Sequence, residues 1–241
     1  MADTTLEFKR ARANQIITLL QANLNIRDED FGSVLVARES GDPFRVLVVT
    51  VLSQSCTDIA ALRAYRNLDK SVGVKVRELA QADLRRIQRA IRVAGLHRQK
   101  ARALKQMAQL VSKRYVGNLD AALDGPLEIV RARLQELPKV GPKTADVLLS
   151  VWGRQTISVD THVDRVSKRL DLAPQKAKYE EVRSELMSLF KKEDYRVVPL
   201  LFMAHGRRFC KATRPLCPIC PVVALCPYPR KTRKLRRSNS V

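Results

Sequence analysis

The stretch Leu137 to Asp160 reads LPKVGPKTADVLLSVWGRQTISVD and predicts a tight turn, one helix, and a loop that ends in an acid. Leu137 and Val140 are the apolar residues of the turn, so we expect their side chains to point inward. Gly141 has no side chain and leaves the backbone bare, so another backbone can approach closely there. The turn therefore has one face for a core and one face for a partner.

A helix follows the turn. Pro142 suits the first helical position and Gly153 suits the end of the helix. Lys143 therefore lies in the first turn, where bare backbone N–H groups attract anions such as phosphate. An amine is also a nucleophile once it is neutral. Helical hairpins with a solvated lysine are nevertheless common, so this turn alone does not establish a reaction. The predicted apolar face of the helix comprises Ala145, Leu148, Leu149 and Trp152.

The composition indicates a basic globular protein. Of 241 residues, 45 are Lys or Arg and 24 are Asp or Glu, which gives a formal net charge of +21. This excess exceeds what solubility requires and indicates a polyanionic partner, above all nucleic acid, although ribosomal and membrane-surface proteins have similar compositions. The first residues, MADTTLEFKRARANQ, contain no signal-peptide core, and no apolar run approaches the length of a membrane span. We therefore expect a soluble, cytoplasmic protein.

Helical periodicity and helix start and stop signals recur along the whole chain, so the sequence predicts an all-α fold. Asp42 and Pro43 supply an N-cap and a first helical residue for the segment that follows them. The valine-rich run 46–52 also has the composition of a strand; its start signal favours a buried helix. The predicted helices cover residues 6–24, 43–52, 60–68, 83–94, 101–115, 127–136, 142–152, 161–170, 179–190 and 199–205.

Five cysteines are an odd number, and four of them are crowded near the C-terminus. This argues against a disulfide scaffold and for reduced thiolates that hold a metal. Four thiolates fit either a zinc site or a [4Fe–4S] cluster, and ligand type alone does not separate the two. Cys56 stands apart and reads as a small buried apolar residue. The four grouped cysteines, spaced C-x6-C-x2-C-x5-C, are Cys210, Cys217, Cys220 and Cys226.

The string LPKVGPKTA, followed after one helix by VDTHVDRV, resembles the helix-hairpin-helix DNA glycosylases of the endonuclease III type. The central C-x2-C with wider gaps on both sides also matches the [4Fe–4S] loop of that family. The resemblance implies two helical domains: residues 36–155 form a six-helix domain with the hairpin. Residues 1–35 pack with residues 156–226, which carry the cluster, and residues 227–241 form a basic tail that we expect to be disordered without DNA.

The resemblance also implies a reaction. Lys143 is the nucleophile that attacks the sugar of a damaged nucleotide after its base has rotated out of double-stranded DNA, and Asp160 stabilises the resulting positive charge. The protein is then a monomeric, bifunctional glycosylase that removes oxidised pyrimidines and cleaves at abasic sites, near the nucleoid of a prokaryotic cell.

Several DNA contacts are implied in the same way. Gln54, or Ser55 one residue later, fills the gap left by the displaced nucleotide; a helix end without a DNA contact is the alternative. Leu96 enters the duplex as a wedge, although an exposed leucine at a turn is often a hydrophobic staple. His162 faces DNA. The remaining predicted contacts belong to the hairpin: Lys139, Val140 and Gly141.

The sequence departs from the family pattern at Lys139, where glycine is usual. A lysine there adds a phosphate contact and also competes for the role of Lys143. Within the family, the rival functions are mismatch uracil or thymine glycosylase and adenine glycosylase, whose members commonly have Tyr or Ser in place of Lys143. A non-catalytic DNA-binding module is the alternative from another class, but docking requires neither Lys143 nor Asp160.

Overall fold

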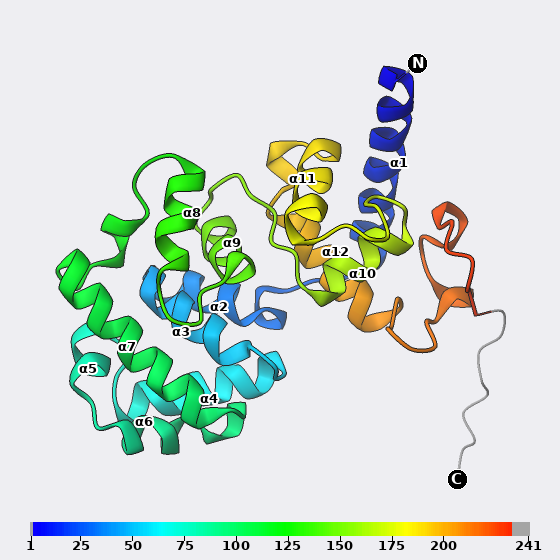
Figure 1. Cartoon of the computed structure of the whole chain (residues 1–241). Coiled ribbons are helices and arrows are strands. Elements are labelled where there is room, and N and C mark those ends of the chain that lie inside the picture. Colours follow the sequence, from blue (N-terminus) through cyan, green and yellow to red (C-terminus); the bar gives the residue numbers. More distant parts are fainter. Residues whose placement is uncertain (1, 233–241) are drawn as a thin grey trace, which may run out of the picture. The chain divides into compact units, whose positions relative to one another are not determined.

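The structure is a computed structural model that describes residues 2–232, with side chains from residue 6 onward, and every regular element in that range is a helix (Figure 1). The predicted all-α class is thus confirmed. The chain divides into two compact units: unit 1 combines Met1–Ile26 with Thr156–Val241, and unit 2 is Arg27–Gln155. The first boundary, which we predicted after residue 35, would cut through α2 (Gly32–Ser40), a helix that belongs to unit 2.

Unit 2 has eight α-helices, whereas the resemblance implied six. The two that the sequence pattern did not show are α2 and the six-residue α5. Three short 3-10 turns complete the unit: η1 (Asp28–Asp30), η2 (Arg92–Ala94) and η3 (Leu119–Ala122). Together with α2, the helices of unit 2 are α3 (Pro43–Ser53), α4 (Asp58–Ser71), α5 (Val76–Gln81), α6 (Leu84–Ala90), α7 (His97–Tyr115), α8 (Leu127–Gln135) and α9 (Pro142–Val151).

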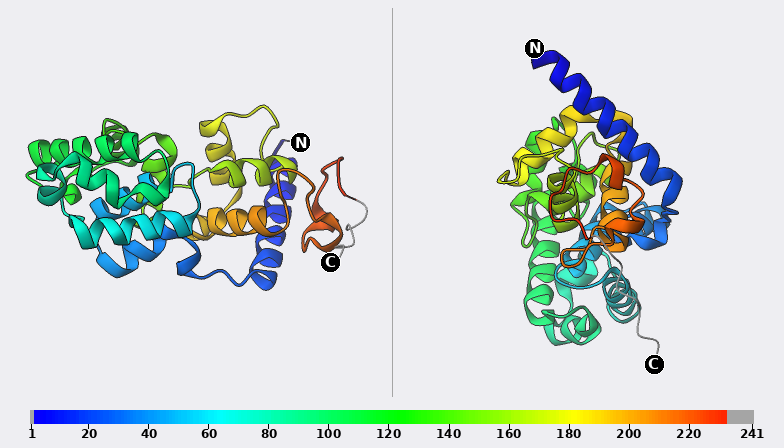
Figure 2. Two further views of the ribbon diagram at one scale, coloured as in Figure 1. Left: turned by 90° about the horizontal axis from the view of Figure 1, so that it is seen from below. Right: turned by 90° about the vertical axis from the view of Figure 1, so that its right-hand side faces the viewer.

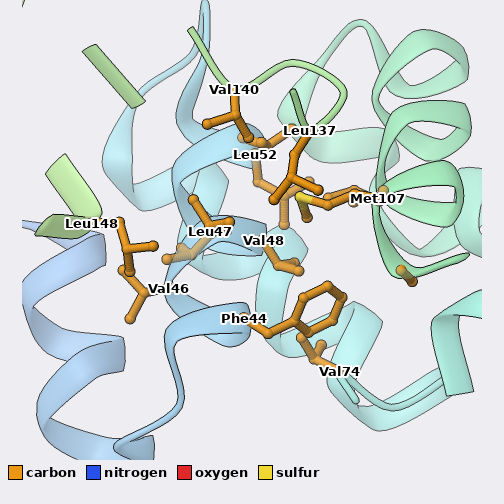
Figure 3. Packing of buried hydrophobic residues seen from close by; sticks show 14 of the residues in the cluster. Phe44, Val46, Leu47, Val48, Leu52, Val74, Met107, Leu137, Val140 and Leu148 are labelled. Carbon is orange, nitrogen blue, oxygen red and sulfur yellow. The ribbon is translucent and has the colours of Figure 1, made fainter. Parts of the chain in front are cut away.

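Helix α3 is the centre of the core of unit 2. The Asp42 side chain caps it by accepting hydrogen bonds from the backbone N–H groups of Phe44 (2.8 Å) and Arg45 (3.4 Å), and residues 43–52 are buried except for Arg45. The valine-rich run is therefore a buried helix, as predicted. Figure 3 shows Leu137 and Val140 of the hairpin beside Leu52 at the C-terminal end of α3, so the core supports the hairpin directly.

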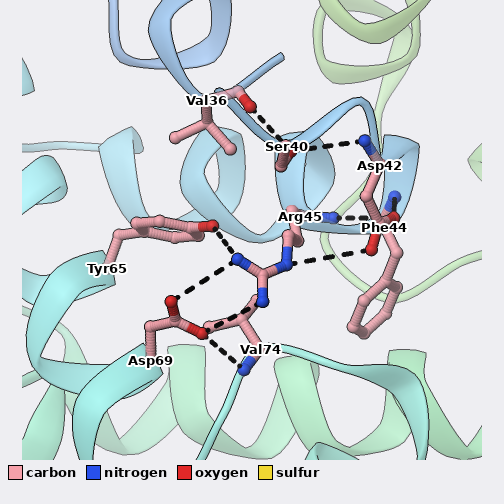
Figure 4. Close-up of polar contacts among 8 residues, drawn as sticks. All are labelled: Val36, Ser40, Asp42, Phe44, Arg45, Tyr65, Asp69 and Val74. Atoms are coloured by element: carbon pink, nitrogen blue, oxygen red, sulfur yellow. Dashed lines mark hydrogen bonds and ion pairs between the residues drawn. The ribbon is translucent and has the colours of Figure 1, made fainter. Parts of the chain in front are cut away.

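A polar network joins the start of α3 to α4 (Figure 4). The Arg45 guanidinium donates to the Tyr65 hydroxyl (3.3 Å) and forms an ion pair with Asp69 (3.3 Å). Asp69 also accepts a hydrogen bond from the backbone N–H of Val74 (3.1 Å). One carboxylate thus fixes both the α3–α4 pair and the turn after α4.

Unit 1 is built from both ends of the chain. Helix α1 (Ala2–Asn23) packs along α11 (Tyr179–Leu189) and α12 (Val197–Arg208), and Figure 2 shows it beside them. Ile16 and Leu20 of α1 are fully buried in this core. Helix α10 (Thr161–Arg169) packs on α11 and α12. The 3-10 turn η4 (Lys192–Asp194) lies between α11 and α12 in the chain. The cysteine segment follows α12 and contains two further 3-10 turns, η5 (Cys217–Ile219) and η6 (Val223–Leu225).

None of the helices within residues 2–232 combines the length and apolar character needed to cross a membrane. The predicted basic tail comprises residues 227–241, of which residues 233–241 lie outside the described part of the chain. The predicted disorder of that part of the tail therefore also lies outside the described residues.

Candidate active site and cysteine loop

The hairpin joins α8 to α9 and has the two faces that the sequence predicts. Leu137 and Val140 are buried, at 3% and 4% exposure, and the backbone N–H of Val140 donates to the carbonyl of Leu137 (3.1 Å). Lys139, at the apex, has a φ of 64°, in the left-handed region that glycine enters without strain. The position where glycine is usual in the resembled family is therefore the position that adopts a glycine-like backbone.

The other face of the hairpin is open. Gly141 has an ordinary φ of −91°, and a Cβ added to it would meet no atom within 4 Å. Within the described residues no atom fills the space beside the Gly141 backbone, so a partner can approach the backbone closely there. Helix α9 begins at Pro142 with no side-chain cap, which leaves its first N–H groups for a ligand.

Lys143 is the second residue of α9. It is half-buried, and its side chain forms no hydrogen bond or ion pair with the rest of unit 2. Within unit 2 the amine is therefore neither paired with an acid nor fixed by a hydrogen bond. Such a lysine is accessible for reaction with a bound electrophile.

A buried ion pair supports α9 from behind. The Arg131 guanidinium of α8 donates from Nε and Nη2 to the two carboxylate oxygens of Asp146 on α9, both at 2.8 Å. Their side chains are 6% and 0% exposed. The sequence analysis did not identify this pair, because an Arg and an Asp fifteen residues apart give no local signal. The pair joins the two helices of the hairpin motif by a bidentate contact.

Gln54 and Ser55 differ in orientation. Gln54 Nε2 donates to the carbonyl of Lys139 (2.9 Å) and to the Thr144 hydroxyl (3.3 Å), so the side chain lies against the hairpin. Ser55 is exposed and has a φ of 56°. Unit 2 thus brings Gln54 to the hairpin that carries Lys143, while Ser55 is the residue turned outward.

Leu96 occupies the turn before α7. It is 53% exposed and has a φ of 46°, which is unusual for a branched apolar residue. A hydrophobic staple would be covered by its own helix, and this side chain is not. The turn therefore presents an apolar side chain to solvent at the cost of backbone strain.

Asp160 and His162 belong to unit 1. Asp160 is the N-cap of α10: its Oδ1 accepts hydrogen bonds from the backbone N–H groups of His162 (2.8 Å) and Val163 (2.7 Å). Both bonds use Oδ1, so among the described residues of this unit Oδ2 remains available to a ligand. Burial lowers the pKa of His162; Asp160 opposes this shift, and Arg165 adds to it.

Arg165 connects α10 to the cysteine segment. Its Nε donates to the carbonyl of Cys210 (2.9 Å) and its Nη2 to the carbonyl of Gly206 (3.1 Å). The same Nη2 lies 3.0 Å from His162 Nδ1. Helix α10, which Asp160 caps, is thereby fixed to the start of the loop that carries the cysteines.

All four predicted cysteine ligands line one pocket, together with Arg169 and His205. Burial, together with the three neighbouring thiolates, raises the pKa of Cys220 to about 11. A thiol with such a pKa stays ionised at neutral pH only beside a positive centre. No three His, Cys, Asp or Glu side chains in the described part of the chain are close enough together to hold a single metal ion.

His205 of α12 was not predicted from the sequence. It is 1% exposed, its Nε2 lies 3.8 Å from Cys220 Sγ, and its Nδ1 has no hydrogen-bond partner among the described residues. Burial, with a smaller contribution from Arg165, lowers the pKa of His205 to about 4. The neutral imidazole of His205 beside Cys220 Sγ therefore adds a polar group to the lining of the pocket, which an ordinary apolar core would lack.

Comparison with known proteins assigns a family to these features. The sequence profile described as "HhH-GPD superfamily base excision DNA repair protein" matches residues 48–192, a range that contains the hairpin, Lys143 and Asp160. The chain is 33% identical over 218 residues to endonuclease III of Sulfolobus acidocaldarius, an alignment that covers 90% of this chain and 96% of that protein.

Solved structures of similar proteins include complexes with DNA. A non-covalent endonuclease III–DNA complex matches with a TM-score of 0.68 and 34% identity, over 78% of this chain and 84% of that chain. An endonuclease III trapped as a covalent intermediate with DNA matches with a TM-score of 0.69 and 30% identity, over 85% of this chain and 97% of that chain.

Proposed function

This chain belongs to the HhH-GPD superfamily of base excision DNA repair proteins, and we propose that it removes oxidised pyrimidines and then cleaves the strand at the abasic site. It is a DNA glycosylase and lyase of the endonuclease III type that acts on double-stranded DNA. We further propose that the protein prefers oxidised pyrimidines, acts as a monomer and works in the cytoplasm of a prokaryotic cell. The roles of the individual residues are part of the same proposal.

The reaction begins when the damaged nucleotide leaves the base stack, because its glycosidic bond cannot be reached inside the duplex. The neutral amine of Lys143 attacks C1′ of the sugar, and the bond to the base breaks with its electron pair on the base, which takes up a proton. The sugar ring opens to a Schiff base. Loss of a proton from C2′ then expels the 3′ phosphate and cuts the strand.

Asp160 stabilises the positive charge that develops on the sugar and takes part in proton transfer with Lys143. The observation in support is its carboxylate, which α10 orients through Oδ1 while Oδ2 remains available. The observation that carries the proposal for Lys143 is its position in the first turn of α9, beside the bare backbone of Gly141.

The DNA contacts divide into phosphate and base contacts. We assign phosphate contacts to the backbone of Val140 and Gly141, the charge of Lys139, and His162. Leu96 is the wedge, in keeping with its exposure of 53%. Gln54 fills the gap in the duplex, for which it must leave the hairpin carbonyl of Lys139; Ser55, already turned outward, is the alternative.

We also propose that the four cysteines hold a [4Fe–4S] cluster. A single zinc ion requires four sulfurs that converge at about 2.3 Å on one point. A [4Fe–4S] cluster instead binds each thiolate through a different iron, so sulfurs spread around one pocket fit it better. When bound, the cluster would join the four thiolates of the loop through its irons; the chain's own Arg169 and Arg165 hold that loop to α10.

The cluster proposal is tested on purified protein. We expect a yellow-brown colour, broad visible absorbance and stoichiometric iron, and Cys217→Ser should lose iron and solubility together. Cys56→Ser, outside the pocket, is the matched control and should retain iron. Stoichiometric zinc without iron in protein made anaerobically would exclude the cluster.

The catalytic proposal is tested by borohydride trapping, which reduces a Schiff base to a stable crosslink. Lys143→Gln should abolish trapping and cleavage while DNA binding persists. Asp160→Asn should slow base removal on the order of a hundredfold to a thousandfold. At a preformed abasic site Asp160→Asn should still be trapped, but more slowly.

The control is Lys139→Gly, which should weaken binding and leave trapping intact. If Lys143→Gln still crosslinks and Lys139→Gly does not, the nucleophile is Lys139. A panel of duplexes that carry oxidised pyrimidines, mismatched uracil or thymine, or mismatched adenine tests the substrate class. Excision of the mismatched bases alone would replace the proposed substrate.

A further inference from the structure

Unit 2 contains a buried lysine that the proposed reaction does not use. Lys100, in the first turns of α7, is 2% exposed. Its Nζ donates to two backbone carbonyls, those of Leu52 and Ala94, each at 2.8 Å. An ammonium is rarely buried this deeply unless it is paired, so a position of this kind calls for a specific reason.

The two acceptors belong to the two loops that carry the predicted DNA contacts. Leu52 lies near the C-terminal end of α3, two residues before Gln54; Ala94 ends η2, two residues before Leu96. Carbonyls at the ends of helical segments lack intrahelical partners and carry negative partial charge. A single buried amine therefore fixes both segments at the point where each begins its loop.

Both loops need such support. Ser55 and Leu96 have φ angles of 56° and 46°, so each loop contains a residue in the left-handed region. Strained conformations of this kind persist only where the surrounding structure imposes them. The same carbonyl of Leu52 also accepts a hydrogen bond from Cys56 Sγ (3.0 Å). The residue that follows Ser55 is thus also tied to the C-terminal end of α3.

The contacts continue to the hairpin. Gln54 Nε2 donates to the carbonyl of Lys139 and to the Thr144 hydroxyl, which flank Lys143. A path of hydrogen bonds and short chain segments thus runs from the turn of Leu96, through Lys100 and the end of α3, to the hairpin. Burial lowers the pKa of Lys100, which means that keeping the ammonium charged inside the folded protein costs free energy.

We propose that Lys100 is a positioning residue that holds the Gln54 loop and the Leu96 turn in register, so that both enter the duplex together when a base rotates out. The proposal rests on the proposed function. It separates two steps: Lys100 serves the rotation of the base, and Lys143 serves the chemistry. A substitution of Lys100 should therefore impair only reactions that require rotation.

The test compares Lys100→Met with Lys105→Met. Lys105 lies on the same helix and donates to a single backbone carbonyl, that of Ala82 (2.7 Å), so it controls for the loss of a lysine–carbonyl bond in α7. The first substrate is a duplex with an oxidised pyrimidine, and the second is a single strand with a preformed abasic site, which has no opposite strand and no base to rotate. A 2-aminopurine beside the lesion reports unstacking by its fluorescence.

We expect Lys100→Met to slow single-turnover excision from the duplex on the order of 100-fold, the size of loss that a misplacement of about 1 Å can cause. The fluorescence rise should slow equally. Trapping on the single strand, circular dichroism and iron content should match wild type, and Lys105→Met should match wild type throughout. Should Lys100→Met fail to fold, Lys100→Gln, which keeps an amide donor, takes its place with the same readouts.

Equal loss on both substrates, or no loss on either, overturns the proposal. Failure of the proposed function has a different signature, because wild type itself then excises no oxidised pyrimidine or is not trapped. If wild type is active on both substrates and Lys100→Met matches it, only the role of Lys100 is wrong.

Discussion

Lys139 combines a functional charge with a strained backbone. At a φ of 64° a residue with a side chain pays for contact between its Cβ and the following carbonyl, and glycine does not. The family resemblance implies that glycine is usual at this position, but the backbone conformation that explains it required the structure. The gain that offsets this strain must come from the side chain, and we assign it to a phosphate contact.

This assignment predicts a difference between two substitutions that remove the same charge. Lys139→Gly should be about 1 kcal/mol more stable than Lys139→Ala, because only glycine relieves the left-handed strain. Both should weaken binding to undamaged duplex to the same extent. Urea unfolding and a fluorescence binding assay measure the two quantities. Equal stability of the two variants would show that the apex adopts another backbone conformation in solution.

His162 predicts a pH dependence of stability. Burial lowers its pKa below 6.5, so in the unfolded chain it takes up protons at a higher pH than in the folded chain. Its contribution to stability is therefore complete above pH 6.5 and decreases as the pH falls through its folded pKa. His162→Gln should lose less unfolding free energy than wild type between about pH 7 and about pH 5. Parallel pH profiles for the two proteins would exclude the shift.

At the scale of the helix, capping residues in the sequence predicted where a helix begins. Asp42 and Pro43 marked the start of α3, and the structure confirms the cap and the buried helix. Helix α2 was missed because its N-cap, Phe31, supplies no side-chain hydrogen bond. Helix α5 was missed because six residues are too few for a periodic pattern and Lys75 caps it without a side-chain bond.

The Arg131–Asp146 pair predicts a large effect at the hairpin. Asp146→Ala leaves the Arg131 guanidinium buried without its main partner and should cost about 3 to 5 kcal/mol in unfolding free energy. The exposed pair between Arg38 and Glu29 is the control, and Arg38→Gln should change the unfolding free energy far less, because solvent screens an exposed ion pair. Guanidinium unfolding of both variants checks the contrast. A small effect of Asp146→Ala would mean that water enters between α8 and α9.

For the whole molecule, the motifs of the candidate site could be read from the sequence because each is short and continuous. Lys143, Asp160 and the four cysteines lie within such segments. Lys100 could not be identified as a core residue, since its two acceptors are 48 and 6 residues away and a lysine in a helix usually faces solvent. The packing of α1 on α11 and α12 joins the two ends of the chain, and no local pattern reports it.

The net charge of +21 predicts how binding to undamaged DNA depends on salt. The logarithm of the binding constant should fall linearly with the logarithm of salt concentration, with a slope of about −0.9 for each phosphate contact. Removal of Arg230 to Val241, which takes away six basic residues, should make this slope shallower and leave lesion preference unchanged. Titrations with the full and shortened chains test this. A changed lesion preference would give the tail a role beyond electrostatic docking.

The construction of unit 1 from both chain ends has a consequence for protein synthesis. Helix α1 leaves the ribosome before unit 2, and α11 and α12, which pack on α1 in the core that buries Ile16 and Leu20, follow only after all of unit 2. At about 5–20 residues per second, residues 27–155 take roughly 6 to 26 s to translate. During that interval the apolar face of α1 is open to chaperones, and a chain that stalls before Arg208 never covers it.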